Sequence, residues 1–314
     1  MKKVFCVGEL LIDFVAEKQG SDLSKAKEFT KKAGGAPANV ACAIGRLGGE
    51  SSFVGCVGDD PFGSFLAGIL DEIKVDISFL QRSNTFTTLA FVSLAEDGER
   101  DFVFSRGADK ELGYDKTLKN KFKNNMLHLG AATSFLGGTL EDSYSRYFQD
   151  AIEAQSFISF DPNYRLDLWK NNEATFIKKC LPFIENSHLC KFSAEEAQLI
   201  SGKENLEEAC DKLHQIGTQI ITITLGAGGT LLSTPSSKKI IPSIKVSPVD
   251  TTGAGDAFIG CLLYQISKLP VLDVIFKDKK TLENMVLIAN KAGAITTTNY
   301  GAIESLPTLS QLES

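Results

Sequence analysis

Short apolar runs alternate with longer helical patterns along most of this chain, and this alternation constrains the fold more than any other feature. The first run is Val4-Phe5-Cys6-Val7-Gly8. The expected strands cover residues 4–8, 52–57, 126–130, 157–161, 189–192, 219–224 and 240–241, and the expected helices cover 38–47, 62–73, 143–155, 174–184, 194–200 and 206–216. Buried strands in such alternation run parallel and are joined by right-handed crossovers. We therefore expect a single α/β domain over residues 1–314, with ligands at the carboxyl edge of a mostly parallel sheet.

One segment breaks this rhythm. Residues 87–104 alternate apolar and polar side chains on both sides of Asp97-Gly98, a pattern typical of an antiparallel hairpin. With the segment that follows the first strand, it predicts a small inserted β sheet formed by about residues 13–32 and 85–107. Such a sheet beside the carboxyl edge can act as a lid over a substrate. The alternative is an ordinary edge hairpin.

Composition argues against several classes of protein. The net charge is −6 and no cluster of Lys and Arg is paired with aromatic residues, so no nucleic-acid partner is expected. No window approaches the uncharged stretch of about 18 residues that a membrane span requires. Seven cysteines lie in apolar runs without CxxC spacing, which predicts free thiols in a reducing compartment, the cytoplasm. Three scattered histidines give no zinc-ligand spacing.

Residues 250–258, Asp-Thr-Thr-Gly-Ala-Gly-Asp-Ala-Phe, combine small residues with a helix start. Gly253, Ala254 and Gly255 carry almost no side chain, so their amide groups can approach an anion. The following residues are largely apolar and free of proline, which predicts a helix from Asp256 with a phosphate seat at its N-terminus. A carboxylate at a phosphate seat needs another task, and proton abstraction from a hydroxyl fits. The alternative is that Asp256 only caps the helix.

A second group of candidate ligand-binding residues lies near the other end of the chain. Gly34 and Gly35 permit close approach of the backbone to a ligand, and Pro37 suits the first turn of a helix. Asn39 offers both a donor and an acceptor, and Asp13, after the first strand, can accept from two neighbouring hydroxyls. The combination favours recognition of a polyhydroxylated molecule. Taken singly, Asn39 could be a helix cap and Asp13 a loop residue.

The two motifs together resemble a known family. Gly34-Gly35-x-Pro37-x-Asn39-x-Ala41 and Asp250-Thr-Thr-Gly-Ala-Gly-Asp256 are similar to the paired signatures of the ribokinase-like, PfkB-type carbohydrate kinases. The resemblance spans nearly the whole chain and implies a ribokinase-like three-layer fold. Four further segments are similar to the fructokinase branch, namely residues 8–14, 53–63, 97–102 and 161–165.

The resemblance implies roles for the sugar and phosphoryl sites. Asp256 would be the catalytic base, and Gly253, Ala254 and Gly255 would form the anion hole for the transferring phosphoryl group. Phosphoryl transfer depends on positioning and charge stabilisation, which amide groups at a helix start can supply. The implied sugar-binding residues are Asp13, Gly34, Gly35, Asn39, Arg106 and Asp256. Arg106 would reach the sugar from the lid, although its segment is shorter than in plant fructokinases.

The resemblance also implies a nucleotide site and two cation sites. Residues 224–229 are similar to the family's nucleotide loop, which is not a Walker A motif. The implied ATP-binding residues are Arg165, Lys191, Thr224, Gly226, Gly229, Gly253, Gly255 and Asn290. Mg²⁺ arrives with ATP and would be organised through water by Glu196, with Glu195 as the alternative, because Ser193 replaces the family's usual asparagine. A K⁺ site would involve Asp250, Thr252, Asn299, Gly301 and Ser305.

These features predict an ATP-dependent fructokinase that phosphorylates D-fructose, with O6 favoured over O1 by resemblance alone. Alternatives within the class are a 2-keto-3-deoxygluconate kinase or a ribokinase. An alternative outside it is a non-catalytic member that binds sugar in a regulatory role, although such members usually lose the aspartate or the glycines of the anion hole. The expected partners are the sugar and ATP. A homodimer through the lid and a monomeric lid fit the sequence equally well.

Overall fold

The computed structural model describes residues 1–17, 20, 22–94 and 100–314, so the Asp97-Gly98 turn lies outside the described residues. In this part of the chain, nine strands form a main sheet in the order β13-β12-β11-β10-β9-β8-β1-β4-β5. Their bounds are β1 (Val4–Val7), β4 (Ser51–Gly58), β5 (Asp76–Ser83), β8 (Met126–Gly130), β9 (Phe157–Asp161), β10 (Leu189–Ser193), β11 (Ile220–Thr224), β12 (Thr230–Thr234) and β13 (Ser237–Ile241). Pairing is parallel from β5 to β11, and β12 and β13 are antiparallel. The expected α/β class is confirmed.

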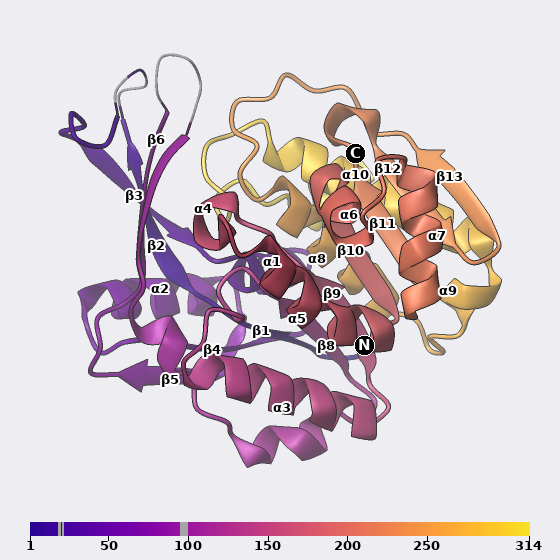
Figure 1. The fold of residues 1–314 in the computed structure, drawn as a ribbon, viewed down its shortest axis with the longest axis horizontal. Helices are drawn as coiled ribbons and strands as arrows, with labels where there is room; N and C mark the ends of the chain where they lie inside the picture. Colours follow the sequence, from indigo (N-terminus) through magenta and orange to yellow (C-terminus); the bar gives the residue numbers. More distant parts are fainter. Residues whose placement is uncertain (18–19, 21, 95–99) are drawn as a thin grey trace.

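Helices cover both faces of the main sheet and complete three layers (Figure 1). One core cluster joins the sheet to α1 (Ala36–Arg46), α2 (Pro61–Glu72), α8 (Ala254–Ser267) and α10 (Lys279–Thr296). The other joins it to α3 (Thr139–Glu153), α5 (Glu173–Asn186), α6 (Ala194–Ser201) and α7 (Leu206–Ile216). Shorter elements are α4 (Leu166–Trp169), α9 (Val274–Lys277), α11 (Leu309–Glu313) and the 3-10 turns η1 (Ala108–Glu111), η2 (Lys116–Lys121) and η3 (Gly226–Gly228). Because both faces are covered, the central strands read as continuous apolar runs.

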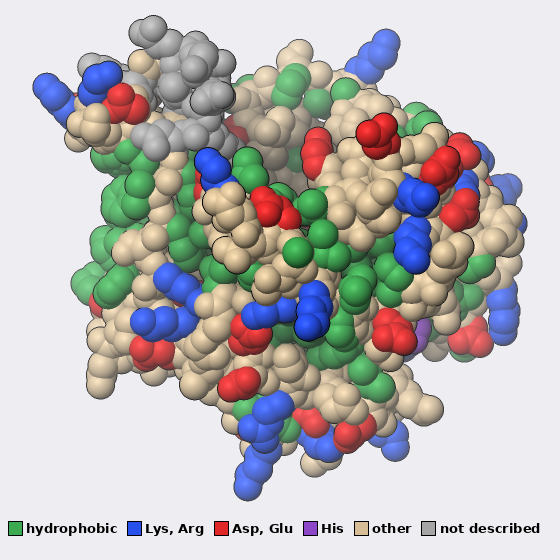
Figure 2. Space-filling view, in the orientation of Figure 1, with side chains coloured by type: hydrophobic (Ala, Val, Ile, Leu, Met, Phe, Trp, Pro, Cys, Tyr) green, Lys and Arg blue, Asp and Glu red, His purple; other side chains and the backbone are tan. Residues whose placement is uncertain are grey.

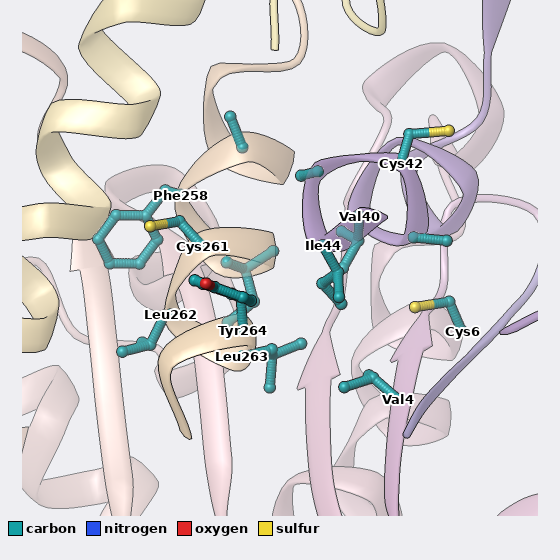
Figure 3. Close-up of a cluster of buried hydrophobic side chains, with 14 of the residues drawn as sticks. Val4, Cys6, Val40, Cys42, Ile44, Phe258, Cys261, Leu262, Leu263 and Tyr264 are labelled. Carbon is teal, nitrogen blue, oxygen red and sulfur yellow. The ribbon is translucent and has the colours of Figure 1, made fainter. Parts of the chain in front are cut away.

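Helices α1 and α8 pack closely against each other. Figure 3 shows Val40 of α1 and Leu263 of α8 in the same buried cluster as Cys6 of β1. A Cβ atom on Gly260 of α8 would lie 2.5 Å from the Cβ of Ala43 in α1. The lack of a side chain at Gly260 therefore allows the two helices to approach, and each begins at one of the two sequence motifs.

A separate four-stranded sheet stands beside the main domain (Figure 1). Its order is β3 (Phe29–Gly34), β2 (Leu11–Ala16), β6 (Leu89–Leu94) and β7 (Arg100–Ser105). Strands β6 and β7 are antiparallel, as expected for the hairpin, and β2 pairs with β6 in parallel. Hydrophobic side chains gather over this sheet in Figure 2. Val103 of β7 is 52% exposed. The lid function of this sheet stays a prediction.

Four elements differ from the sequence prediction. Strands β5 and β12 were not expected, and residues 233–239, predicted as a turn, are mostly strand. Ser237, Lys238 and Lys239 begin the edge strand β13, where exposed side chains are tolerated and the polar pattern is misleading. Helix α8 begins at Ala254, two residues before the predicted start at Asp256. Among the described residues, no helix combines the length and hydropathy that crossing a bilayer requires.

Candidate active site

A cavity of about 760 Å³ lies between the carboxyl edge of the main sheet, the second sheet and the loop before α8. The hollow beside the second sheet is visible in Figure 2. Nine of the predicted site residues line the cavity, namely Asp13, Gly35, Asn39, Arg165, Asp250, Thr252, Gly253, Asp256 and Gly301. A smaller cavity of about 270 Å³, between β12 and the helices α9 and α10, contains none of the predicted residues. The larger cavity is therefore the candidate active site.

The predicted phosphate seat lies at the start of α8, and anion binding there stays a prediction. Gly253 is the N-cap of α8 and has a φ of 77°, in the left-handed region that favours glycine. A Cβ on Gly253 would lie 2.7 Å from the Cβ of Ala302, so a side chain there would also collide with the C-terminal loop. At Gly255, a Cβ would lie 3.0 Å from Nζ of Lys191. The start of α8 thus combines a helix N-terminus with a nearby ammonium group.

Asp256 lies in the first turn of α8 and is 8% exposed. Nδ2 of Asn39 donates a hydrogen bond of 2.8 Å to Oδ2 of Asp256. Burial raises the pKa of Asp256 to about 6, and the bond from Asn39 and the charge of Lys191 limit that rise. The carboxylate is ionised at neutral pH yet close enough in pKa to accept a proton. If Asp256 only capped α8, it would not need the hydrogen bond from Asn39 on α1.

Asn39 carries a second indication of a ligand. Its Oδ1 is buried and has no hydrogen-bond partner among the described residues. A buried acceptor without a partner costs about 1–3 kcal/mol, which a ligand hydroxyl can offset. Because Oδ1 and Asp256 belong to one side-chain pair on the cavity wall, the unpaired atom indicates a hydroxyl next to the base.

Buried charges lie beneath the start of α8. Nζ of Lys191 on β10 is 3.0 Å from Oδ2 of Asp161 on β9, and both side chains are nearly inaccessible. Burial by itself lowers the pKa of Lys191, but three nearby carboxylates, Asp161 foremost, outweigh it and raise the pKa to about 12. Lys191 therefore keeps its positive charge next to Gly255 at the start of α8.

Glu196 is the second carboxylate near Lys191. It is 5% exposed, and its two oxygens accept backbone hydrogen bonds of 2.8 Å from Tyr164 and 2.7 Å from Ser193. Burial raises its pKa, and the charge of Lys191 opposes the rise. Glu195, the sequence alternative, is exposed. The structure therefore favours Glu196 as the member of the pair that belongs to this site.

Among the predicted sugar-binding residues, Asp13 lines the cavity and Arg106 does not. Gly34 is required beside Asp13, because a Cβ at Gly34 would lie 2.0 Å from Oδ2 of Asp13. Arg106 lies outside the cavity lining, and its guanidinium donates to the carbonyls of Thr133, Leu136 and Gly137 and to Asp109. Those contacts fasten the base of the second sheet to the loop after β8. A sugar contact by Arg106 stays a prediction.

The predicted nucleotide residues lie on neighbouring elements but do not share one cavity. Thr224, Gly226 and Gly229 form the loop after β11, where Gly229 has a φ of 91° and a Cβ would lie 2.1 Å from the carbonyl oxygen of Ile241. The side chain of Asn290 bonds other residues of the protein. It accepts a hydrogen bond of 2.6 Å from the hydroxyl of Thr230 and donates one of 2.9 Å to the carbonyl of Ile241. Asn290 therefore joins α10 to the edge of this loop.

Arg165 is exposed and lines the cavity, and hydrogen bonds to Asn163 and Tyr164 hold its side chain. Its Nη2 donates 2.9 Å to Oδ1 of Asn163, and its Nη1 donates to the carbonyl of Tyr164. Asn163 has a φ of 48°, which turns the chain directly after β9. Its buried Nδ2 has no partner among the described residues. Arg165 and the Asn163 donor therefore provide polar groups for an anionic ligand.

The predicted potassium residues are held around Asp250. Oδ1 of Asp250 accepts 2.9 Å from the amide of Thr252, and Oδ2 accepts 3.0 Å from the amide of Gly301. Ser305 donates to the carbonyl of Tyr300, whereas Asn299 is exposed and bonds only its neighbour Thr298 among the hydrogen bonds found. These bonds bring Thr252 and Gly301 to Asp250, and K⁺ binding by these residues stays a prediction.

Glu9 is a site residue that the sequence reasoning missed. It is 1% exposed, lines the cavity, and its Oε1 accepts 3.0 Å from the amide of Ala36. Burial raises its pKa to about 7, with the charge of Asp109 adding to the rise and that of Arg165 opposing it. The sequence feature that could have identified Glu9 is an acidic residue just after a buried strand, because ligands bind at the carboxyl edge of a parallel sheet.

Comparison with known proteins identifies the family. Residues 1–309 match the domain described as pfkB family carbohydrate kinase. The chain belongs to this family. The resemblance that the two motifs suggested is thereby confirmed over nearly the whole sequence, and so is the class of ATP-dependent carbohydrate kinase.

Individual relatives of this pfkB carbohydrate kinase include several fructokinases. Fructokinase-1 of Zea mays is 40% identical over 309 residues, which cover 97% of this chain and 94% of its own. Fructokinase of Xylella fastidiosa with bound ATP superimposes with a TM-score of 0.88 at 29% identity, covering 99% of this chain and 97% of its own. A fructokinase double mutant of Vibrio cholerae O395 with fructose, ADP and potassium gives a TM-score of 0.86 at 31% identity. The superposition covers 100% of this chain and 97% of the fructokinase chain.

The donor set of the pfkB kinase fits an ion that arrives with the nucleotide better than a resident metal. Within the described part of the chain, no group of three or more His, Cys, Asp or Glu side chains could hold a metal ion. Both oxygens of Glu196 already accept backbone amides, so contact with Mg²⁺ through water suits it better than direct ligation. The role of Glu196 toward Mg²⁺ stays a prediction.

Proposed function

We propose that this pfkB kinase is a fructokinase that transfers the γ-phosphoryl group of ATP to the O6 hydroxyl of D-fructose. The substrate is supported by the fructokinases among its relatives, including the Zea mays and Vibrio cholerae proteins. The observation that carries the chemistry is the hydrogen-bonded pair of Asp256 and Asn39 at the start of α8. The proposal is supported by three features of this pair: the proposed base lies in the first turn of α8, Asn39 holds it, and Oδ1 of Asn39 has no partner among the described residues.

In this proposal Asp256 acts as the general base. Asn39 holds Oδ2, so Oδ1 accepts the proton of the attacking hydroxyl. The pKa near 6 keeps Asp256 ionised at neutral pH and lets it take the proton as the O–P bond forms. Asn39 Oδ1 accepts a hydrogen bond from a second sugar hydroxyl, and Asp13 binds hydroxyls from the second sheet.

The phosphoryl group sits at the start of α8, where Gly253, Ala254 and Gly255 present backbone amides. The helix N-terminus and the ammonium of Lys191 stabilise negative charge that spreads over the phosphoryl oxygens. ATP lies over the loop at residues 224–229, with Arg165 at its phosphates. Mg²⁺ near Glu196 and K⁺ near Asp250 would add positive charge to this region. The second sheet closes over the sugar and excludes water.

A sugar panel tests the substrate. Purified protein with MgATP is offered D-fructose, D-ribose and 2-keto-3-deoxygluconate, and ADP release is followed. We expect the highest kcat/KM with fructose, and ³¹P and ¹³C NMR of the product should show the phosphate on C6. Asp256→Asn serves as the control for contaminating kinases. Turnover of ribose or ketodeoxygluconate without turnover of fructose would reject the substrate, and phosphate on C1 would reject the position.

A further inference from the structure

Glu9 is a buried carboxylate on the cavity wall that the phosphoryl-transfer chemistry does not use. It is only 1% exposed, and burial raises its pKa to about 7. Burying an ionisable group costs free energy unless its contacts offset the loss of water. The contacts of Glu9 should therefore explain why a carboxylate stands at this position.

The firm contact of Glu9 is with the start of α1. Its Oε1 accepts 3.0 Å from the amide of Ala36, the first residue of the helix. Gly35 is the N-cap and has no side chain to cap the helix, and Pro37 has no amide hydrogen. Thr133 is the other partner, at a longer 3.4 Å. The carboxyl group thus stands in for the missing cap by giving the first turn of the helix a hydrogen-bond acceptor.

The capped turn carries the residue that holds the base. Asn39 follows Ala36 by three positions, so the two residues lie one helical turn apart on the same face of α1. Nδ2 of Asn39 donates to Asp256 at 2.8 Å. The close contact of Gly260 with Ala43 fixes the next turn of α1 against α8. In the first turn, Pro37 packs against Gly8 and Gly130, and Glu9 adds a hydrogen bond to the amide of Ala36.

We propose that Glu9 is a positioning residue that fixes the first turn of α1 and thereby holds Asn39 against Asp256. This inference rests on the proposed role of Asp256 as the base. A shift of about 1 Å in a catalytic group can cost about 100-fold in rate. A residue that only stabilised the helix would change the melting temperature and leave the turnover of folded protein unchanged.

A double-mutant cycle tests the relay. Glu9→Ala should lower kcat by about 10- to 100-fold, and Glu9→Gln should keep most activity, because its amide oxygen can still accept from Ala36. In an Asn39→Ala background, Glu9→Ala should change kcat by less than about threefold, since the residue through which it acts is gone. Independent, multiplying effects would overturn the proposal. So would normal kcat in Glu9→Ala with only a lower melting temperature.

A matched control removes another helix-capping carboxylate. Asp278 accepts 3.1 Å from the amide of Thr281 at the start of α10, and the 18 residues of that helix separate this end from the site by about 27 Å. Asp278→Ala should lower the melting temperature without changing kcat. If Glu9→Ala does not fold, Glu9→Met, which fills the volume without an acceptor, replaces it in the cycle.

The double-mutant cycle can be interpreted whether or not fructose is the substrate. The cycle is measured with whichever sugar of the panel the wild-type protein phosphorylates fastest. Failure of fructose as a substrate rejects the fructokinase proposal and leaves the coupling between Glu9 and Asn39 measurable. Additivity with a good substrate rejects the relay and leaves the function in place.

Discussion

Replacing Asp256 by asparagine should separate activity from stability. The change keeps the side-chain volume, and the asparagine carbonyl can still accept the 2.8 Å hydrogen bond from Asn39. The variant cannot take a proton from the sugar hydroxyl, so kcat should fall by about 10²- to 10⁴-fold. The affinity for ATP should change little, because the glycines at the start of α8 remain.

The same substitution should stabilise the fold. Burial raises the pKa of Asp256 from its ordinary 3.8 to about 6, so the folded protein holds this proton more tightly than the unfolded chain. Ionisation therefore lowers the free energy of unfolding as pH rises from about 4 to above 6. A pKa raised from 3.8 to about 6 corresponds to about 3 kcal/mol as an upper value. Asparagine has no such cost, so the variant should be more stable at pH 8 than the wild type and lose this advantage near pH 4.

Two measurements check these expectations. Coupled assays of ADP release give kcat and KM, and urea unfolding at pH 4, 6 and 8 gives the stability difference. In the wild type, kcat/KM should fall about tenfold per pH unit below the pKa near 6. Asp76→Asn, which breaks a half-exposed ion pair with Lys3, is the control for a change of aspartate away from the site. Near-normal kcat in folded Asp256→Asn would refute the role of the base, and a less stable variant at pH 8 would refute the stated cost of burial.

Two further predictions follow from packing and buried charge. Gly34→Ala places a Cβ 2.0 Å from Oδ2 of Asp13, so it should displace that carboxylate and weaken sugar binding at least tenfold by calorimetry, by about 1.4 kcal/mol or more; unchanged sugar affinity would contradict the role of Asp13. Lys191→Met leaves Asp161 buried without its 3.0 Å partner, and urea unfolding should show a loss of about 3–5 kcal/mol. Equal stability would show that Asp161 finds another partner.

Periodicity was enough to predict most of the central fold. The apolar runs at β1, β8 and β9 are buried on both faces, and central strands of a covered parallel sheet are the usual place for such runs. Strand β13 was largely missed because Ser237, Lys238 and Lys239 lie at an exposed sheet edge, where burial does not dictate the side chains. Edge strands are specified by pairing with their neighbours, which a local pattern does not reveal.

The candidate site, like the fold, was only partly predictable from the sequence. Motifs with special backbone needs were recognisable, because Gly253 has a positive φ and a Cβ on Gly34 would collide with the carboxylate of Asp13. Contacts between distant segments were not recognisable. Neither the bond from Asn39 to Asp256 nor the one from Ala36 to Glu9 follows from spacing, because both depend on how helices pack on the sheet. The internal bonds of Arg106 and Asn290 have the same origin.

The tight contact between α1 and α8 has a consequence for how sugar preference can change. Gly260 and Ala43 hold the two helices at one separation, and the proposed base and anion hole both lie at the start of α8. Much of the remaining cavity wall, including Val92 and Phe102, comes from the second sheet. Specificity can therefore diverge by substitution in that sheet while the reaction machinery stays intact. Laboratory evolution toward a new sugar should begin with those wall positions and leave the helix pair untouched.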